Sequence, residues 1–335
     1  MDYRNLGRSG VKVSRLCLGS MTFGGPTDEP TAGRIVAKAK DQGVNFIDTA
    51  DGYTGGKSEE VVGRAIGNQR HDWVLATKLG NVRGKWPNQG GLSRKWVIQC
   101  AEASLRRLGT DYIDILYLHK EDHETPLVET VRALAALQRD GKIRYFGVSN
   151  HRSWRIAALC HLCDEMGIDR PAVSQPYYHA LYRVAEVEQL PVCKNYGIGV
   201  VSYSPLARGV LTGKYVPGVQ AAKDSRAGRA DKRMLETEFR PETLEAAQKF
   251  KAYADQRGVV AAHLAVAWVL NNTLMTGVVA GPRTEAQWDD YVKALEVTFT
   301  KEDEAFVDSL VSPGHPAAPG YNDPQYPIEG RVSRV

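Results

Sequence analysis

Four side chains capable of acid–base chemistry follow three apolar runs of the chain. The run Phe46–Ile47 leads into Asp48, and Tyr53 follows five residues later in the stretch NFIDTADGY. Lys78 comes directly after the run VLAT, and His119 comes directly after ILYL. Each residue taken alone also suits a structural role, such as a helix cap or a solvated surface group. Their recurrence at the same place after each run indicates one shared site.

These four residue types together suit the reduction of a carbonyl group. A tyrosine has an ordinary pKa of about 10, so it needs help to give up its proton near neutral pH. A lysine cation beside Tyr53 favours the phenolate, and an aspartate beside that lysine holds the cation in place. Tyr53 can then protonate an alkoxide as it forms, while His119 donates a hydrogen bond that orients the carbonyl. This chemistry requires no metal, and a nicotinamide cofactor is the natural source of the electrons.

The elements that position these residues read as strands alternating with helices. Amphipathic stretches such as TAGRIVAKAKDQG and SRKWVIQCAEASLRRLG separate the apolar runs, which predicts parallel strands joined by helical crossovers. Eight such units in 335 residues predict a (β/α)8 barrel. The rival is a doubly wound sheet, whose Gly-rich phosphate turn is missing from LCLGSMTFGG. The expected strands are Arg15–Gly19, Asn45–Asp48, Trp73–Thr77, Ile113–Leu118, Tyr145–Ser149, Val173–Gln175, Gly199–Tyr203 and Thr276–Ala280.

Nearly every expected strand ends in a residue that can donate, accept or stack. In a barrel of this class the active site lies at the carboxyl ends of the strands. Besides the four residues above, these ends supply Ser149, Asn150, Gln175, Tyr203 and the GPR stretch that starts at Gly281. A purely structural barrel does not need polar groups at one rim, so this coincidence indicates a catalytic rim.

Residues that typically start or end helices recur along the chain, and the sequence predicts a single barrel domain over residues 1–335. Ser58 and Ser93 suit helix starts, Pro126 suits a first helical turn, and glycines close several helices. The helix-ending glycines are expected at Gly43, Gly67, Gly109 and Gly141. Residues 204–240 read as a long loop insertion rich in glycine and charge, and residues from about 313 onward read as an irregular Pro/Gly-rich tail.

The bulk composition is that of an ordinary globular protein. Lys and Arg number 43 against 39 Asp and Glu, a net charge of +4 that is too weak to indicate nucleic acid. The polar start MDYRNLGRSG does not resemble a signal peptide, and no apolar run reaches the length of a membrane span. Five scattered cysteines suit a reducing cytoplasm, where we expect this protein to be located. Cys160 and Cys163 form a C-x-x-C pair without further metal ligands at suitable spacing, so a packing role is favoured.

Several motifs together resemble the aldo-keto reductase family. The stretch GVNFIDTADGY followed by GKSEEVVGRAI resembles the most diagnostic segment of that family. The segments ATK, SLRRLGTDYIDILYLH, GKIRYFGVSN, YSPLARGVLTGKY and GPRTEAQWDD follow in the family's order. The resemblance extends from about Leu6 to Leu310, almost the whole chain.

The resemblance implies an NADPH-dependent reductase of aldehydes or ketones. Tyr53 would be the proton donor, Asp48 and Lys78 would tune it, and His119 would orient the carbonyl. Ser149, Asn150 and Gln175 would hold the nicotinamide carboxamide, and Tyr203 would stack on the ring. The remaining implied cofactor contacts are Ser20, Met21, Ser204, Pro205, Leu206, Lys214, Arg226, Gly281, Arg283, Gln287 and Asp290.

Two residues depart from the pattern of the family. Tyr291 stands where the family often has asparagine, which puts an adenine contact in question. Lys120 follows the histidine where many relatives carry another residue, and it borders the substrate mouth. Phe23, Trp86 and Tyr321 are further candidates for lining the pocket.

Three other functions compete with the reductase. The same family includes channel-associated regulatory subunits, in which the histidine position can be substituted, whereas His119 is present here. The stretch HKEDH, from His119 to His123, suggests a metal-dependent hydrolase, but the first strand lacks the H-x-H ligands that such barrels use. The basic run KDSRAGRADKRM is short and lacks interleaved aromatics, so a cofactor clamp is favoured over nucleic-acid binding. We expect a small-molecule carbonyl or alcohol substrate and no membrane partner, and a homo-oligomer is compatible with the sequence. The physiological substrate, the direction of reaction and the oligomeric state stay open.

Overall fold

Eight parallel strands close into a barrel in a computed structural model that describes residues 1–328. The strands neighbour one another in chain order, and β10 pairs with both β9 and β3 to complete the ring. This closed parallel barrel confirms the predicted (β/α)8 fold. The strands are β3 (Leu16–Gly19), β4 (Phe46–Asp48), β5 (Val74–Leu79), β6 (Ile113–Leu118), β7 (Ile143–Ser149), β8 (Val173–Gln175), β9 (Gly199–Ser202) and β10 (Gly277–Ala280).

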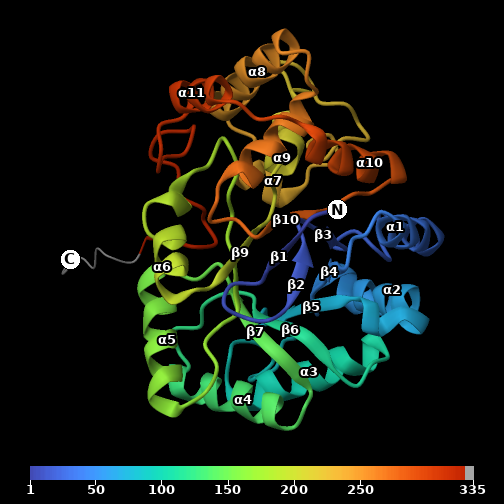
Figure 1. The fold of residues 1–335 in the computed structure, drawn as a ribbon, viewed down its shortest axis with the longest axis vertical. Helices are drawn as coiled ribbons and strands as arrows, with labels where there is room; N and C mark the ends of the chain where they lie inside the picture. Colours follow the sequence, from blue (N-terminus) through green and yellow to red (C-terminus); the bar gives the residue numbers. More distant parts are fainter. Residues whose placement is uncertain (329–335) are drawn as a thin grey trace. The chain divides into compact units, whose positions relative to one another are not determined.

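Helices lie outside the barrel strands, as Figure 1 shows for α1 to α6. Their apolar faces are buried while most of their charged residues remain at the surface, the usual arrangement of an amphipathic crossover helix. Glu59 of α2 and Arg155 of α5 are buried exceptions. Two 3₁₀ segments, η1 (Tyr53–Gly56) and η2 (Gly67–Asp72), flank α2. The helices are α1 (Glu29–Asp41), α2 (Lys57–Ile66), α3 (Arg94–Leu108), α4 (Leu127–Arg139), α5 (Ser153–Met166), α6 (Gln189–Tyr196) and α10 (Glu285–Lys293).

Most of the predicted helix ends are found, with two corrections. The Ser93 hydroxyl accepts from the Trp96 backbone N–H at the start of α3, and Gly109 ends that helix with φ of 62°. Ser58 does not cap α2, because the helix already begins at Lys57 and the Ser58 side chain is buried. Gly67 does not stop the chain in a left-handed turn, since its φ of −42° continues directly into η2.

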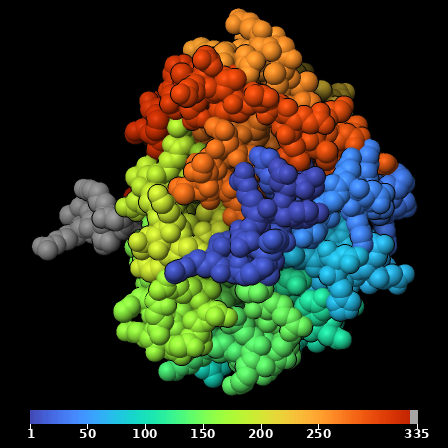
Figure 2. Space-filling view, viewed as in Figure 1, coloured from blue at the N-terminus to red at the C-terminus, as the bar shows by residue number. Residues whose placement is uncertain are grey.

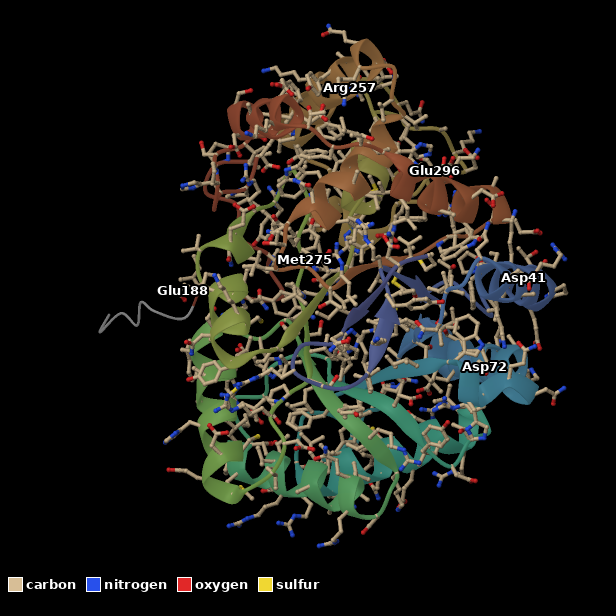
Figure 3. The ribbon with its side chains drawn as sticks, in the orientation of Figure 1. Asp41, Asp72, Glu188, Arg257, Met275 and Glu296 are labelled. Carbon is tan, nitrogen blue, oxygen red and sulfur yellow. The ribbon has the colours of Figure 1, made fainter. Side chains whose placement is uncertain are left out.

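A short antiparallel hairpin, unforeseen from the sequence, lies at the amino-terminal end of the barrel. It pairs β1 (Tyr3–Asn5) with β2 (Lys12–Ser14), and the turn between them carries Leu6 into the barrel core. The Arg4 guanidinium donates to the Met275 carbonyl at 2.5 Å, just before β10; Met275 is labelled in Figure 3. Figure 2 shows this N-terminal segment in dark blue at the front of the molecule in that view. The hairpin therefore covers the end of the barrel opposite to the carboxyl ends of its strands.

The described chain divides into two compact units. The first holds the barrel and comprises Met1–Pro176, Glu188–Tyr203 and Asn272–Val292. The second comprises Tyr177–Val187, Ser204–Asn271 and the chain from Lys293 onward. Its helical segments are η3 (Val184–Glu186), η4 (Ala207–Thr212), α7 (Lys232–Glu236), α8 (Pro241–Gln256), α9 (Ala261–Asn271), η5 (Ala294–Glu296) and α11 (Lys301–Leu310).

The long loop and the tail belong to this second unit. Residues 204–240 are mostly irregular, as expected, but they include η4 and α7. Arg233 in α7 pairs with Asp323 through two contacts of 3.0 and 2.5 Å, and the Arg240 guanidinium lies 4.4 Å from the centre of the Tyr321 ring. The tail is irregular from 313 to 328, and its expected continuation over 329–335 lies outside the described residues. These contacts fasten the tail to the end of the loop.

Two bulk features of the sequence can be compared with the structure. All five cysteines are free and buried. None of the helices in the described part of the chain combines the length and apolar character needed to cross a bilayer.

Candidate active site

The barrel brings the four predicted catalytic residues together at the carboxyl ends of adjacent strands. Asp48 is the last residue of β4, Lys78 is the last but one of β5, and His119 follows β6 directly. Tyr53 opens η1, five residues after the end of β4. Parallel strands in register deliver their final residues to the same rim, so the three side chains from β4, β5 and β6 meet there.

The Lys78 ammonium group lies at the centre of this cluster. Its Nζ contacts the Asp48 carboxylate, donates to the Thr49 carbonyl at 2.9 Å and lies 3.2 Å from the Tyr53 hydroxyl oxygen. Lys78 and Asp48 are both buried. Burial by itself lowers the pKa of Lys78, but the Asp48 carboxylate and the Tyr53 oxygen outweigh it, so the pKa lies above the ordinary lysine value. Lys78 is therefore a fixed cation against the tyrosine oxygen.

A tight turn after β4 places Tyr53 over this cation. The Tyr53 backbone N–H donates to the Ala50 carbonyl at 3.1 Å, and the next residue, Thr54, has φ of 47°. The Thr54 hydroxyl donates to the Phe23 carbonyl at 2.8 Å, which stabilises this otherwise strained conformation. Lys78 Nζ lies 4.9 Å from the centre of the Tyr53 ring, so the ring also packs against the cation.

His119 lies beside Tyr53 as a neutral imidazole. The two rings are 6.0 Å apart between centroids and inclined at 80°. Burial is the largest cause that lowers the pKa of His119 to about 3, and the Lys78 and Lys120 cations lower it further. Across the ordinary pH range His119 is thus a hydrogen-bonding group rather than a charged acid.

The residues predicted to hold nicotinamide form a second layer that touches the catalytic residues. Gln175 Nε2 donates to Asp48 Oδ2 at 3.0 Å, and the Ser149 hydroxyl donates to the Gln175 carbonyl at 2.9 Å. The Asn150 amide donates to the His119 carbonyl at 2.8 Å and to Ser149 Oγ at 3.1 Å, while its oxygen accepts from the Tyr203 hydroxyl at 2.8 Å. Asn150 adopts φ of 55°, which asparagine tolerates better than most residues.

Ser20 and Met21 continue directly from the end of β3. The Ser20 backbone N–H donates to the Asp48 carbonyl at 2.9 Å, and its hydroxyl contacts both that carbonyl and the Ser58 hydroxyl. The Met21 side chain is largely exposed beside this buried network. The chain after the first barrel strand therefore packs against the end of β4.

Gly281, Arg283, Gln287 and Asp290 lie after β10 and along α10. Gly281 follows β10 directly and has open space where a Cβ would stand. The Gln287 side chain accepts from the Arg283 backbone N–H at 2.8 Å, and the Thr284 hydroxyl accepts from the Gln287 backbone N–H at 3.3 Å. These contacts place Arg283 immediately before the amino terminus of α10.

The other predicted cofactor residues lie in the second unit. Ser204, with φ of 58°, begins the long loop, and Pro205 and Leu206 lead into η4. Lys214 Nζ lies 5.2 Å from the centre of the Tyr215 ring. Arg226 pairs with Asp231 at 2.9 Å, just before α7. The structure therefore groups these five residues with the loop and not with the barrel unit.

Comparison with known proteins decides the family. The family model described as "Aldo/keto reductase family" matches residues 15–312, nearly the whole barrel and most of the second unit. The chain belongs to the aldo/keto reductase family. As a member, it is an oxidoreductase by descent, and the named relatives include both reductases and channel subunits.

Three relatives show how this aldo/keto reductase compares with other members. An Arabidopsis thaliana protein named as a probable voltage-gated potassium channel subunit beta is 39% identical over 302 residues, which cover 89% of this chain and 92% of the relative. A Bacillus subtilis protein, the uncharacterized oxidoreductase YrpG, is 39% identical over 317 residues, covering 90% and 93%. The versiconal hemiacetal acetate reductase of Aspergillus parasiticus is 32% identical over 355 residues, covering 94% and 99%.

Four residues that sequence reasoning did not assign to the site also lie in it. The Thr49 carbonyl accepts from Lys78, and the Ser58 hydroxyl bonds to Thr49 Oγ1 at 2.9 Å and to the Ser20 carbonyl at 2.7 Å. The Asn81 amide nitrogen lies 3.0 Å from His119 Nδ1. Asp51 is buried two residues before Tyr53. Proximity in sequence to the catalytic strand ends was the available signal, because all four lie within ten residues of Asp48 or Lys78.

The HKEDH stretch has a structural arrangement of its own. Glu121 accepts from the Arg152 guanidinium at 2.6 Å, and His123 Nε2 lies 3.3 Å from the Glu121 carboxylate. Asp122 accepts from the Leu92 backbone N–H at 2.7 Å and thereby ties this loop to the loop after β5. Over residues 1–328, no group of three or more His, Cys, Asp or Glu side chains is arranged to hold a metal ion.

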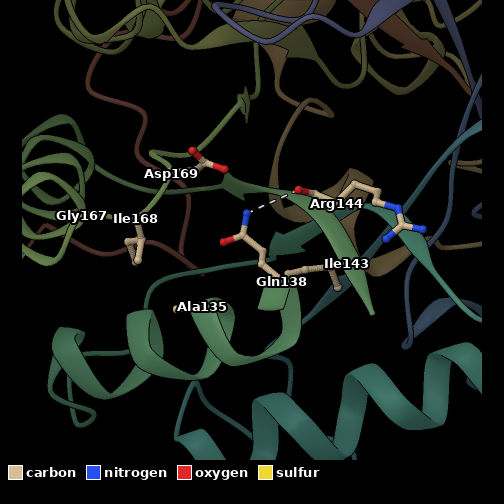
Figure 4. A pocket seen from close by; sticks show the side chains of 7 residues that line it. All are labelled: Ala135, Gln138, Ile143, Arg144, Gly167, Ile168 and Asp169. Carbon is tan, nitrogen blue, oxygen red and sulfur yellow. Dashed lines mark hydrogen bonds between the residues drawn. The ribbon is translucent and has the colours of Figure 1, made fainter. Parts of the chain in front are cut away.

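A surface cavity of about 370 Å³ lies away from the catalytic rim (Figure 4). It is bordered by the start of β7, the second half of α4 and the chain after α5. Gln138 Nε2 donates to the Arg144 carbonyl at 3.4 Å across it. The lining residues are Ala135, Gln138, Ile143, Arg144, Gly167, Ile168 and Asp169, and no predicted catalytic residue is among them.

Proposed function

We propose that this protein reduces aldehydes or ketones to alcohols with NADPH, and that Tyr53 is the proton donor. The contact between Lys78 Nζ and both the Asp48 carboxylate and the Tyr53 oxygen carries this proposal. A buried cation held by a carboxylate stabilises the negative charge that develops on the tyrosine oxygen as its proton leaves.

The remaining rim residues have matching roles. The neutral His119 ring donates a hydrogen bond to the carbonyl oxygen, which orients the substrate and withdraws electrons from the carbon. NADPH, when bound, supplies the hydride that this carbon accepts. Tyr53 then transfers its proton to the alkoxide oxygen, and Lys78 stabilises the resulting phenolate until water restores the proton.

The residues beyond the catalytic four fit a nicotinamide cofactor. Ser149, Asn150 and Gln175 offer donors and acceptors suited to a carboxamide, and the half-buried Tyr203 offers an aromatic face for the ring. Gly281 leaves open space before Arg283 and the amino terminus of α10, where a phosphate is stabilised by backbone N–H groups and the helix dipole. Ser204, Pro205, Leu206, Lys214 and Arg226 would follow the cofactor from the long loop.

The Tyr53→Phe variant tests the proton donor. We expect kcat for aldehyde reduction to fall ~10²–10⁴-fold, because a general acid typically contributes that factor. The dissociation constant for NADPH, measured by titration of protein fluorescence, should stay near the wild-type value since the ring is retained. Tyr196→Phe, which removes a hydroxyl from α6, is the matched control and should retain wild-type kcat. A Tyr53→Phe enzyme with near wild-type kcat would exclude Tyr53 as the donor.

A regulatory subunit that binds the cofactor without rapid turnover is the second candidate. It is favoured by the Arabidopsis thaliana relative and by an Oryza sativa relative, 38% identical over 302 residues, which carries the same channel-subunit name. The complete set of Asp48, Tyr53, Lys78 and His119 favours the enzyme, since a binding module has no need of the proton donor. A screen of NADPH oxidation across aldehydes, ketones, sugars and quinones separates the two: turnover supports the enzyme, and tight NADPH binding without turnover supports the subunit.

A further inference from the structure

His119 is held on three sides by its neighbours. Its backbone N–H donates to the Leu79 carbonyl at 2.8 Å, and its carbonyl accepts from the Asn150 amide at 2.8 Å. The third contact is made by the ring, whose Nδ1 lies 3.0 Å from the Asn81 amide nitrogen. Asn81 comes three residues after Lys78, in the loop that follows β5.

The chemistry of the two groups determines where the ring proton lies. An amide nitrogen carries two N–H groups and cannot accept, so Nδ1 must be the acceptor in this contact. A neutral imidazole holds one proton, on either Nδ1 or Nε2. The groups facing the ring are Lys78, Lys120 and Tyr53, and no carboxylate of the described chain pairs with it to favour a second proton. The proton therefore lies on Nε2, and Nε2 has no partner among the described residues.

We propose that Asn81 is a positioning residue that sets the tautomer of His119, so that Nε2–H is the hydrogen-bond donor to the substrate carbonyl. The role in reduction rests on the proposed function, whereas the position of the proton does not. The opposite tautomer would present the lone pair of Nε2 to the carbonyl oxygen, which would repel it. Without Asn81, the ring could exchange between the two neutral forms and lose part of its donor population.

Nitrogen NMR of the wild-type protein tests the tautomer without any turnover. With ¹⁵N-labelled histidine, the His119 signals, assigned by comparison with His119→Asn, should show Nδ1 without a proton and Nε2 with one at neutral pH. A proton on Nδ1, or averaged signals for both nitrogens, would overturn the proposal. This result stands by itself even if the Tyr53→Phe test were to exclude reduction by this site.

The Asn81→Asp variant tests the consequence for catalysis. A carboxylate of the same shape can only accept, so it draws the ring proton to Nδ1 and favours a second proton on the ring. At low pH both nitrogens of the charged ring carry protons and Nε2 still donates. As pH rises through the raised pKa of His119, the remaining proton stays on Nδ1 and kcat should fall ~10²–10³-fold, the effect of losing one such donor.

The control is Asn88→Asp, which adds the same charge to the same loop at an exposed position with φ of 65°. We expect this control and the wild type to lack the histidine step in kcat between pH 5 and 9, with similar dissociation constants for NADPH. A pH profile of Asn81→Asp that matches the wild type, with wild-type kcat at high pH, would overturn the proposal. If Asn81→Asp does not fold, the wild-type nitrogen spectrum still decides.

Discussion

The catalytic cluster places several ionisable side chains where water is largely excluded. Lys78 and Asp48 are both buried, and each satisfies the other, so removal of one partner would leave an uncompensated buried charge. Thr49 and Gln175 supply the remaining hydrogen bonds to the pair. At the scale of single residues, the site therefore depends on complete pairing rather than on exposure to solvent.

Asp51 is the exception, because it is a buried carboxyl group without such pairing. Asp51 is 1% exposed, and neither of its carboxylate oxygens has a hydrogen-bond partner among residues 1–328. The Cys100 thiol lies beside the carboxyl group. Burial raises the pKa of Asp51 to about 6; Arg83 and Arg107 oppose this effect and Glu59 adds to it. At neutral pH the protein thus holds a poorly solvated negative charge two residues before Tyr53.

This raised pKa predicts a pH-dependent stability. The pKa of Asp51 in the folded protein lies above its unfolded value of 3.8, so the folded protein binds this proton more tightly. The stabilisation of the fold by the protonated carboxyl group is therefore fully present below pH 3.8 and is lost as pH rises through about 6. Asp51→Asn should therefore stabilise the protein at pH 7, by at most about 3 kcal/mol, and give no comparable gain at pH 4. Urea denaturation at both pH values measures the difference. The exposed Asp41→Asn (labelled in Figure 3) is the charge control, and an equal effect of both variants at pH 7 would contradict the prediction.

Arg283 is the residue that we expect to give NADPH preference over NADH. The adenosine 2′-phosphate carries negative charge that NADH lacks, and a planar guanidinium fork suits a phosphate group. Arg283 comes shortly before α10, whose amino terminus is the positive end of the helix dipole. Arg283→Ala should weaken NADPH binding by roughly 10- to 150-fold, or about 1.5–3 kcal/mol, and hardly change NADH binding. Dissociation constants for both cofactors measure this effect.

Arg34→Ala provides the control for that measurement. Arg34 of α1 pairs with Glu285 in the first turn of α10 at 2.6 Å, so its removal takes a cation away from that turn without changing the loop that holds Arg283. We expect the ratio of the two dissociation constants to stay at the wild-type value in this variant. An equal loss for both cofactors in Arg283→Ala, or a wild type that prefers NADH, would disprove the assignment.

Helix packing around the barrel depends on a close approach between α2 and α3. Gly63 lies in α2, and a Cβ added there would stand 2.2 Å from the Leu108 carbonyl oxygen at the end of α3. That atom is backbone and cannot move away without shifting the helix. Glu59, one turn earlier, accepts from Arg107 of α3 at 2.6 Å, so the same two helices are also joined by an ion pair.

Gly63→Ala should therefore destabilise the protein, by about 1–3 kcal/mol, because overpacking forces the two helices apart. Gly33→Ala is the matched control in α1. It has open space where its Cβ would stand, and alanine is the better helix former by about 1 kcal/mol, so it should stabilise the protein slightly. Thermal and urea unfolding of both variants measures the expected loss of stability in Gly63→Ala and the expected gain in Gly33→Ala. A Gly63→Ala variant as stable as Gly33→Ala would show that the helices can separate at little cost.

At the scale of elements, local patterns predicted much of the architecture. All eight barrel strands lie within about two residues of their expected ends, because short apolar runs between amphipathic stretches are a local signal. The hairpin of β1 and β2 was missed, since its three-residue strands alternate too briefly to be recognised. Ser58 was misassigned as a cap because serine before a run of Glu resembles a helix start, whereas tertiary contacts use its hydroxyl inside the helix.

Closure of the barrel turns distant positions in the chain into neighbours. Gln175 and Asp48, which are 127 residues apart in sequence, form a hydrogen bond across the rim. The pairing of β10 with β3 brings the loop after the last strand next to the first, where Thr22 Oγ1 lies 3.4 Å from the Pro282 carbonyl. The whole molecule therefore supplies the rim with residues from every part of the barrel.

The sequence by itself determined the alternation of strands and helices and the polar residues at the strand ends, and hence the barrel and the choice of the four candidate catalytic residues. The alternation and the polar strand ends depend only on the order of residue types along the chain, which any short stretch of sequence displays. Only the tertiary structure decided which atoms meet: that Lys78 contacts Thr49 as well as Asp48, that Asn81 faces Nδ1 of His119, and that Asp51 is buried without a matching partner. These outcomes depend on strand register and side-chain rotamers at distances of about 3 Å, and no local pattern specifies positions so closely.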